Sequence, residues 1–382
     1  ICVPMSITSG VGLVSQEEKF GRVIAGDSYK NYLLLKSNDF AYNKSSTKEY
    51  PEGFLTLYSG SELAAVPNSI FTCFRVKGES PDPRFLNYQF SDNLHGRWLR
   101  NFIQVGARAN GALSINDGDL MALPVPMPSG ITAVIEQQKI ADCLSSLDEL
   151  IAAQARKVDA LKTHKKGLMQ QLFPREGETQ PRLRFPEFRD TGEWEIRELS
   201  EFIIERNEYP TDKVPLFSLT IEDGVTPKTE RYERSFLVND EADAYKLVLP
   251  NDFAFNPMNL RFGAIGRHSG TEKVAVSRYY NIFSCDETVD SSFCETYFRS
   301  ERMVAFYDER AIGSLIEKRR VHFSAFLKFN IRFPRLPEQQ RIADCLSSLD
   351  ALIAASTQEL ESLKSHKKGL MQQLFPRVEN SI

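Results

Sequence analysis

Apolar residues recur at alternating intervals of four and three positions along residues 136–172. This spacing is typical of a long α-helix with one apolar stripe, the seam through which helices pair in a coiled coil. Two seam positions are polar, and polar seam residues usually fix register and partner choice. At about 1.5 Å per residue the helix should be roughly 55 Å long, ending before Phe173 because Pro174 disfavours helix at the preceding residue. The seam comprises Ile140, Leu144, Leu147, Ile151, Gln154, Val158, Leu161, Lys165, Leu168 and Leu172.

The same helix occurs a second time. Residues 338–377 repeat residues 136–175 at a constant offset of 202, with 30 of 40 positions identical. Two related helices with open apolar seams are expected to pair antiparallel, related by a pseudo-two-fold axis, although the pattern is compatible with parallel pairing as well. The chain is therefore a duplicated object with two similar halves. The second seam comprises Ile342, Leu346, Leu349, Ile353, Ser356, Leu360, Leu363, Lys367, Leu370 and Leu374.

A module of mixed α and β structure precedes each helix. Residues 32–35, 53–58 and 69–76 are short, rich in aromatic and β-branched residues and bounded by turn formers, which predicts strands, whereas residues 111–128 read as a strand or loop. The modules are related, since residues 6–8 match 218–220, residues 38–43 match 251–256, and residues 69–73 match 281–285. We expect an α+β protein with modules at residues 1–132 and 181–334, and with the helices and a linker at 133–180 and 335–382.

The composition indicates a globular protein of the cytoplasm. It is 42% hydrophobic and 26% charged, without a secretory signal or an apolar run of membrane-spanning length. Six cysteines without a CxxC pair favour reduced thiols. The chain opens on Ile1, and about 32 residues that precede the second module have no counterpart before the first, so we expect the beginning to be cut away.

The repeated helix carries a family resemblance. The strings EQQxIADCLSSLDxLI and KKGLMQQLFPR, together with two variable modules, resemble the specificity subunit of Type I restriction-modification systems. The resemblance implies a non-catalytic subunit whose two target recognition domains each read one half of a bipartite sequence in double-stranded DNA. It also implies that the helices space the domains and dock two methyltransferase subunits, through which two restriction subunits join. S-adenosylmethionine, ATP and Mg are then expected on the partner subunits, with no cofactor bound by this chain.

Local basic stretches agree with DNA binding, although the net charge is -4. Residues 93–116 carry three arginines and no acid, and residues 261–278 and 310–328 are also rich in Arg and Lys. Asn suits adenine, Arg suits guanine, and both Arg and Lys hold phosphates. Tyr42 and Phe255 are expected in cores. The candidate DNA-binding residues are Asn43, Lys44, Arg97, Arg100, Arg108, Asn256, Asn259, Arg261, Arg267, Lys318, Arg319 and Arg320.

Enzymatic functions lack their motifs. There is no phosphate-binding GxxxxGK[ST] sequence, residues 256–259 lack the second proline and the aromatic of an adenine methyltransferase motif, and no histidine stands at metal-ligand spacing. We therefore expect no catalytic or metal site. Two alternatives remain open at this stage: a self-sufficient restriction or modification enzyme of a related class, and a coiled-coil scaffold that does not read DNA.

Overall fold

The computed structural model describes residues 2–8, 10–103, 113–228, 244–314 and 319–376. Two of the candidate DNA-binding residues, Arg108 and Lys318, lie outside these ranges. The chain forms two compact units: unit 1 contains residues 1–156 and 357–382, and unit 2 contains residues 157–356. Both boundaries fall inside the long helices, so each unit contains part of both. No helix in the described ranges is long and apolar enough to cross a membrane.

The described residues of unit 1 form two sheets. β2 (Gly12–Ser15), β1 (Cys2–Thr8), β6 (Leu63–Val66) and β3 (Leu33–Leu35) form one, in which β1 and β6 are parallel. β5 (Phe54–Leu57), β4 (Asp39–Asn43) and β7 (Phe71–Arg75) form the other, which is antiparallel. The helical segments are α1 (Gln16–Phe20), η1 (Asp27–Asn31), α2 (Pro83–Ser91), α3 (Leu94–Leu99) and α4 (Asp117–Met121).

Helix α4 corrects one sequence prediction. It lies in the stretch that we expected to be a strand or loop. The Asn116 side chain caps it by accepting a hydrogen bond from the Gly118 N–H, and Asp117 and Asp119 lie in its first turn, where acids are favourable. With only 5 residues, the helix is too short to produce an apolar periodicity.

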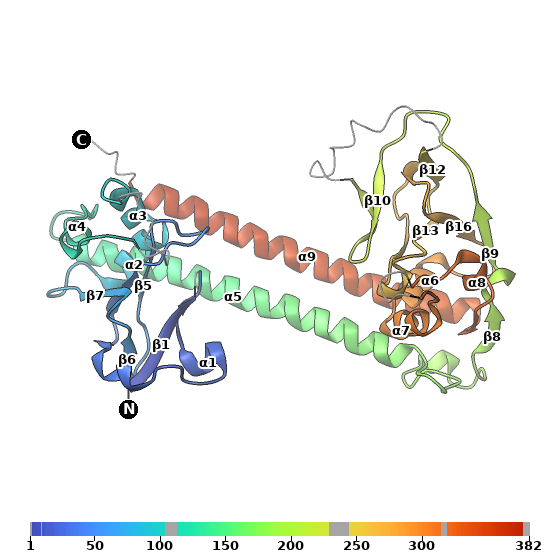
Figure 1. The fold of residues 1–382 in the computed structure, drawn as a ribbon, viewed down its shortest axis with the longest axis horizontal. Coiled ribbons are helices and arrows are strands. Elements are labelled where there is room, and N and C mark those ends of the chain that lie inside the picture. The colour runs from blue at the N-terminus through green and yellow to red at the C-terminus, as the bar shows by residue number, and fades with distance from the viewer. Residues whose placement is uncertain (1, 9, 104–112, 229–243, 315–318, 377–382) are drawn as a thin grey trace. The chain divides into compact units, whose positions relative to one another are not determined.

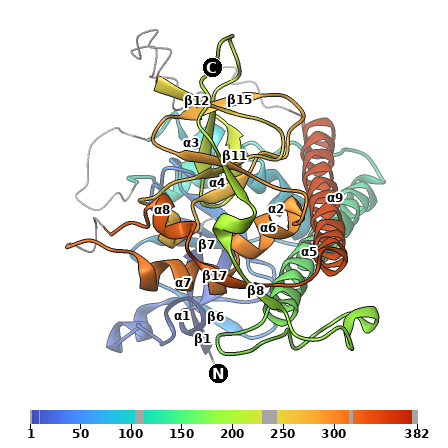
Figure 2. The ribbon, with the colours of Figure 1, turned by 90° about the vertical axis from the view of Figure 1, so that its right-hand side faces the viewer.

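In the part of unit 2 that the structure describes, the strands form four sets. β14 (Ile265–Arg267), β13 (Phe253–Phe255), β16 (Asn281–Cys285) and β9 (Ile203–Arg206) form its largest sheet. The two-stranded pairs are β10 (Phe217–Thr220) with β11 (Gly224–Pro227), β12 (Tyr245–Val248) with β15 (Val274–Ser277), and β17 (Asn330–Phe333) with β8 (Glu195–Glu198). In Figure 2 the β12–β15 pair lies at the opposite end of the unit from β8 and β17.

The helical segments of unit 2 pack beside these strands. They are η2 (Pro186–Phe188), η3 (Leu199–Glu201), η6 (Leu260–Phe262), α6 (Ser291–Phe298), α7 (Glu301–Arg310) and α8 (Phe323–Phe326). The core of the unit is strongly aromatic: Phe253 stacks on Phe283 with ring centroids 5.0 Å apart, and Phe326 and Phe298 lie against the same cluster. Phe255 and Tyr42 are both completely buried, each in the core of its own unit.

The matched motifs of the two modules adopt the same local structure. The hairpins β1–β2 and β10–β11 have one register, since Thr8 pairs with Gly12 as Thr220 pairs with Gly224. In the second motif, Asn38 and Asn251 both have positive φ, at 70° and 68°, which Asn tolerates better than most residues. The aspartate that follows each of them accepts a hydrogen bond from the backbone N–H three positions earlier.

The matched Ile-Phe strands are shifted by three residues. The sequence match aligns Phe71 with Phe283. However, Phe283 pairs with Phe253 of β13, and the equivalent of Phe253 is Phe40, which pairs with Phe74. The Phe40–Phe74 rings stack at 5.1 Å and 12°, like Phe253–Phe283 at 5.0 Å and 4°. Phe74 is therefore the structural counterpart of Phe283, and strand pairing overrides the local sequence match.

The two long helices are α5 (Ala133–Leu172) and α9 (Leu336–Leu374). Helix α5 ends at the predicted residue and begins three residues before the predicted start at 136. Within unit 1, the first part of α5 lies beside the last part of α9, and within unit 2 the last part of α5 lies beside the first part of α9 (Figure 1). In each unit the two helix segments therefore run antiparallel.

Candidate nucleic-acid interface and helix seam

Every predicted seam residue is buried or half-buried in the structure. Leu144 and Leu346, which are equivalent in the two copies, have 0% and 1% of their surface exposed. The polar position Gln154 is also buried, and its Nε2 donates to Glu359 Oε2 at 2.8 Å. Since a buried amide is stable only when it is hydrogen-bonded, Gln154 favours the register that places Glu359 opposite it.

The second polar seam position forms the same ion pair in both units. In unit 2, Lys165 Nζ lies 2.6 Å from Asp350 Oδ1, and in unit 1, Lys367 Nζ lies 2.5 Å from Asp148 Oδ1. Lys165 and Lys367 are separated by the repeat offset of 202 residues, and so are Asp148 and Asp350. The helix segments therefore pair in the same register in both units.

Each long helix also holds its module through repeated contacts. Gln137 Oε1 accepts from the Asp82 N–H in unit 1, and Gln339 Oε1 accepts from the Asp290 N–H in unit 2, both at 2.8 Å. Asp82 and Asp290 are the N-caps of α2 and α6, so both glutamines fix the start of the helix that packs on the coil. The repeat thus anchors two different modules in one way.

The repeated aromatic residue at the end of each helix packs in the same manner. Phe375, just beyond α9, contacts Phe85 of α2 with ring centroids 5.5 Å apart, and Phe173, just beyond α5, contacts Phe293 of α6 at 5.9 Å. These four side chains are buried. The phenylalanine near the end of each repeat is therefore part of the core of its unit.

In unit 2, the structure brings together candidate DNA-binding residues from two distant segments. Arg261 and Arg319 both reach Asp308 Oδ1 of α7, at 3.1 and 3.4 Å. The Val321 N–H donates to the Pro257 carbonyl at 3.0 Å, so residues 319–321 lie against the turn that contains Asn256 and Asn259. We call Asn256, Asn259, Arg261, Arg319 and Arg320 the unit 2 cluster.

Members of this cluster differ in whether their side chains already have hydrogen-bond or ion-pair partners within the protein. The Asn256 side chain accepts from the Met258 N–H at 3.1 Å, and Asp308 holds Arg261 and Arg319. Asn259 and Arg320 are exposed, and neither side chain forms a hydrogen bond or ion pair within the described ranges. These two residues therefore have the donors that are available to a ligand.

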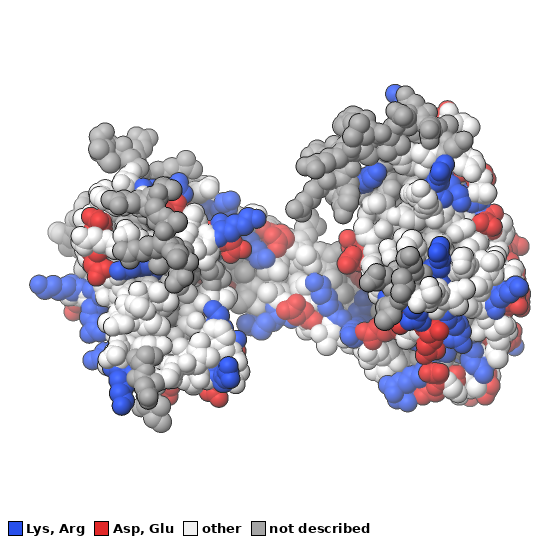
Figure 3. All heavy atoms as spheres, viewed as in Figure 1, with Lys and Arg blue, Asp and Glu red and all other residues white. Residues whose placement is uncertain are grey.

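The remaining described candidate of unit 2, Arg267, is the last residue of β14. Its Nε is 3.0 Å from Glu295 Oε2, and its Nη1 donates to Asn251 Oδ1 at 2.6 Å. These contacts join the sheet to α6. Figure 3 shows the wider pattern, in which Lys and Arg side chains are interspersed with Asp and Glu over the lower part of unit 2.

The candidates of unit 1 are engaged in contacts within the unit. Lys44 Nζ lies 3.0 Å from Asp117 Oδ1. The Thr72 hydroxyl, which donates to the same carboxylate at 2.7 Å, is the largest cause of the lowered pKa of Asp117, followed by Lys44. Arg97 pairs with Asp92 at 3.0 Å.

The other two unit 1 candidates that the structure describes are Asn43 and Arg100. The Asn43 side chain accepts from the Ser45 N–H at 2.9 Å, as Asn256 accepts from the residue two positions after it. Arg100 pairs with the buried carboxylate of Glu52, although 61% of the arginine side chain is exposed. The structure does not bring the unit 1 candidates into one cluster comparable to that of unit 2.

Exposed apolar side chains beside the unit 2 cluster were not predicted from the sequence. Phe262 is 49% exposed with the Arg261 guanidinium 4.3 Å from its ring centre, and Met258 is 53% exposed. Tyr279, which is 78% exposed, lies under Arg278 at 5.9 Å. The adjacent Arg-Phe and Arg-Tyr pairs in the sequence were the available signal, but only the structure shows that the rings face solvent.

Among the described residues, no group of three or more His, Cys, Asp or Glu side chains is arranged to hold a metal ion. His95 is buried, and its burial lowers its pKa to about 4. The Cys73 thiol is half-buried, and its desolvation raises its pKa to about 12. Because desolvation favours the uncharged forms of His95 and Cys73, these side chains contribute to packing.

Known proteins that are similar to this chain are specificity subunits of type I restriction enzymes. Residues 313–365 match the family model of the Type I restriction modification DNA specificity domain. The chain is 25% identical to the putative type I restriction enzyme MjaX specificity subunit of Methanocaldococcus jannaschii, over 91% of the chain and 80% of that protein. A second relative, the MjaVIII specificity subunit of the same organism, is 23% identical over 73% of the chain and 68% of its own length.

Solved structures share the fold of this chain. The S subunit of a Type-I restriction-modification system from M. genitalium matches with a TM-score of 0.54 and 13% identity, over 99% of the chain and 89% of its own length. A chain from a structure on complex assembly and conformational transition of the type I R-M system matches with a TM-score of 0.51 and 15% identity, covering 90% and 82%. At these identities, the comparison concerns the fold.

Proposed function

We propose that this chain is the non-catalytic, DNA-reading subunit of a Type I restriction-modification complex in the cytoplasm, and that each module reads one half of a bipartite duplex target. The observation that carries the proposal is the repeated anchoring of two diverged modules by one duplicated helix, through Gln137 and Gln339. Identical anchors hold two readers in equivalent orientations, while diverged modules allow each reader its own half-site. Relatives named as specificity subunits support the same role.

The proposal assigns two roles to the long helices. As an antiparallel coiled coil with a pseudo-two-fold axis, they would set the distance between the half-sites and dock two methyltransferase subunits, through which two restriction subunits join. The equal register of the Lys165–Asp350 and Lys367–Asp148 pairs supports such an axis. S-adenosylmethionine, ATP and Mg would then be bound by the partner subunits.

Within unit 2, we assign DNA contact to the unit 2 cluster. Arg320 and Asn259 would reach phosphates or base edges, while Asp308 orients Arg261 and Arg319. Replacing Arg320 with Ala should weaken duplex binding and make the dependence of affinity on salt less steep by about one counterion, as expected for the loss of a phosphate contact. Unchanged affinity and an unchanged salt slope would remove Arg320 from the interface. Lys364→Ala, on the surface of α9, is the control.

Module exchange tests the function as a whole. Residues 181–334 would be replaced by the matching module of a relative, and the sites methylated by the assembled complex would be mapped across the host genome. We expect one half-site to change, while the other half-site and the gap between them are kept. A change in both halves would contradict independent reading. Methyl transfer by the purified chain alone would instead favour a self-sufficient enzyme.

A further inference from the structure

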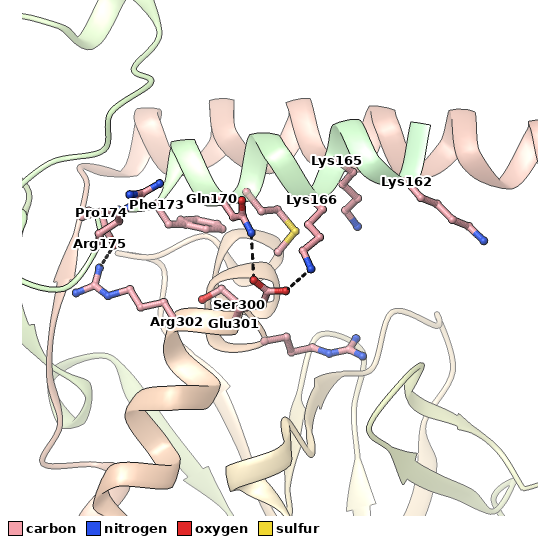
Figure 4. A pocket seen from close by; sticks show the side chains of 12 residues that line it. Lys162, Lys165, Lys166, Gln170, Phe173, Pro174, Arg175, Ser300, Glu301 and Arg302 are labelled. Carbon is pink, nitrogen blue, oxygen red and sulfur yellow. Dashed lines mark hydrogen bonds and ion pairs between the residues drawn. The ribbon is translucent and has the colours of Figure 1, made fainter. Parts of the chain in front are cut away.

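A basic cavity lies in unit 2 between the end of α5 and the start of α7 (Figure 4). Its volume is about 530 Å³. The side chains from α5 and the segment after it line one side, and residues 299–302 line the other. None of these residues belongs to the unit 2 cluster.

The charges around this cavity are unbalanced. Its lining contains six cationic side chains and one carboxylate, that of Glu301. Lys166 pairs with Glu301 at 2.8 Å, and Lys165 pairs with Asp350 at 2.6 Å. Within the described part of the chain, the side chains of Lys162 and Arg175 form no ion pair, although the Glu178 carboxylate lies near Arg175 and accepts from its backbone N–H at 3.0 Å. The six cations are Lys162, Lys165, Lys166, Arg175, Arg299 and Arg302.

Two of the arginines are fixed in place by backbone carbonyls. Arg302 donates to the Pro174 carbonyl, and Arg299 donates to the Ile221 carbonyl at 2.9 Å. Among the described residues, Arg302 has no ion-pair partner, whereas Arg299 Nη1 also lies 3.9 Å from Glu295 Oε1. Such pre-positioned cations attract an anionic group at little further cost in side-chain entropy.

The cavity also has an apolar part. Met169, Phe173 and Pro174 contribute to its lining, and Phe173 stacks on Tyr297 with ring centroids 5.0 Å apart. Phosphates of a DNA backbone would satisfy the cations but would leave this apolar surface uncovered. Concave sites with a mostly apolar wall and a few oriented polar groups are typical of ligands that bury an apolar body.

The internal repeat shows what is special about this site. Eight lining residues come from residues 162–175, and all eight have identical counterparts 202 positions later. The other side of the cavity differs: with the N-caps Asp82 and Asp290 aligned, residues 299–302 (RSER) correspond to residues 91–94 (SDNL). In unit 1 the repeated lysine Lys367 is occupied, since it pairs with Asp148 and lies 5.1 Å from the Tyr88 ring centre. The cationic side supplied by Arg299 and Arg302 is therefore particular to unit 2.

We propose that this cavity is the docking site for an acidic segment of a partner protein that inserts one large apolar side chain beside Met169 and Phe173. Carboxylates of the segment bind Lys162, Arg175 and the guanidinium of Arg302. The inference deepens the docking role proposed for the long helices, and it rests on that role for the existence of a protein partner. It adds an asymmetry, because one of the two otherwise equivalent helix ends has the additional cationic side.

The test uses the full-length chain and a display library of short random peptides. We expect the selected peptides to combine Asp or Glu with Leu, Phe or Trp. Their affinity should fall about tenfold, equivalent to about 1.4 kcal/mol, in the double variant Lys162→Glu/Arg175→Glu. The matched control is Lys364→Glu, because Lys364 is the repeat counterpart of Lys162, and it should change the affinity less than about twofold.

Several results would overturn the proposal. The selection could enrich no peptide, or it could enrich peptides without an excess of Asp and Glu. The double variant and the control could also lose peptide affinity equally. If short random-sequence duplexes displace the peptides and bind the double variant more weakly, the cavity contacts DNA phosphates instead. Binding of the specific duplex target is measured on the same variants. If the chain binds its specific duplex but no peptide, only the docking role of the cavity is refuted. If it binds peptides but no specific duplex, the DNA-reading function is refuted.

Discussion

Glu338 and its counterpart Glu136 show how one repeated residue acquires two roles. Glu338 is 2% exposed, and its carboxylate accepts two hydrogen bonds of 2.7 Å from Arg184, itself buried, and one of 3.3 Å from Trp194. Glu136 occupies the same position in the first copy, and it is exposed. The sequence shows identical residues, while the neighbours decide which of them is structural.

We predict that Glu338→Gln destabilises unit 2 by about 3 kcal/mol, because it leaves the buried Arg184 guanidinium without its counter-charge. The repeat supplies the control, since Glu136→Gln removes a solvated charge and should change the unfolding free energy by less than about 0.5 kcal/mol. Denaturant unfolding of both variants measures the difference. Equal effects at the two positions would show that the buried pair contributes nothing specific.

His95 gives a second prediction at this scale. Its Nε2 lies 3.4 Å from the Gly53 carbonyl, and its Nδ1 is buried without a hydrogen-bond partner among the described residues. Burial lowers the pKa of His95 to about 4 from 6.5. As the pH falls below 6.5, the unfolded chain takes up a proton before the folded one does. The stability due to neutral His95 is thus complete above pH 6.5 and is lost towards pH 4, by about 3 kcal/mol.

The variant His95→Gln should therefore reduce the loss of unit 1 stability between pH 6.5 and pH 4. Unfolding free energies measured across this range test the expectation. His164→Gln, at an exposed position of α5, is the matched control. If both variants follow the parent chain, His95 does not control the acid response.

Single helices and strands were predictable where the pattern is long. The four-three spacing predicted α5 to within three residues at its start and to the residue at its end, because the pattern covers many turns. Helix α4, with 5 residues, left no such pattern. The register of β7 against β4 could not be predicted by matching short sequence segments. It depends on whether Phe71 or Phe74 stacks on Phe40, which is set by tertiary packing.

Pairing of the helix elements can be tested by a double-mutant cycle on Asp148 and Lys367. The two side chains are 44% and 21% exposed, so we expect a coupling of about 0.5–1 kcal/mol that decreases as salt is added. The repeated pair Asp350–Lys165 should give a similar value. The control is Lys364–Glu361, which lies within one helix and should couple by about 0.3 kcal/mol. Absence of coupling in both interhelical pairs at low salt would contradict the register.

At the scale of the whole molecule, duplication explains why the local contacts occur twice. Gln137 and Gln339 accept from the N-cap residues of equivalent helices, and Phe375 and Phe173 fill equivalent places in the two cores. The candidate DNA interface does not repeat in the same way. Unit 2 gathers its candidates around Asp308, whereas those of unit 1 are held in separate ion pairs. Shared anchors and different surfaces suit a protein whose halves read different sequences.

Inserting one heptad into each long helix tests the proposed spacer. Because seven residues add about 10 Å while keeping the seam aligned, the unread gap of the target should grow by about three base pairs, with both half-sites unchanged. Mapping the methylated sites measures the gap. A heptad in α5 alone breaks the paired register, and we expect it to reduce assembly instead. An unchanged gap in the double insertion would rule out the spacer role.

The sequence by itself determined the duplication, the long helices and their seams, because periodicity and repetition are properties of neighbouring positions along the chain. It also indicated the family. Only the tertiary structure decided which polar groups are free. Arg261 and Arg319 are 58 positions apart, yet both are held by Asp308, whereas Arg320 beside Arg319 is exposed. Whether a charge is paired depends on residues brought close by packing, and local sequence does not contain those distances.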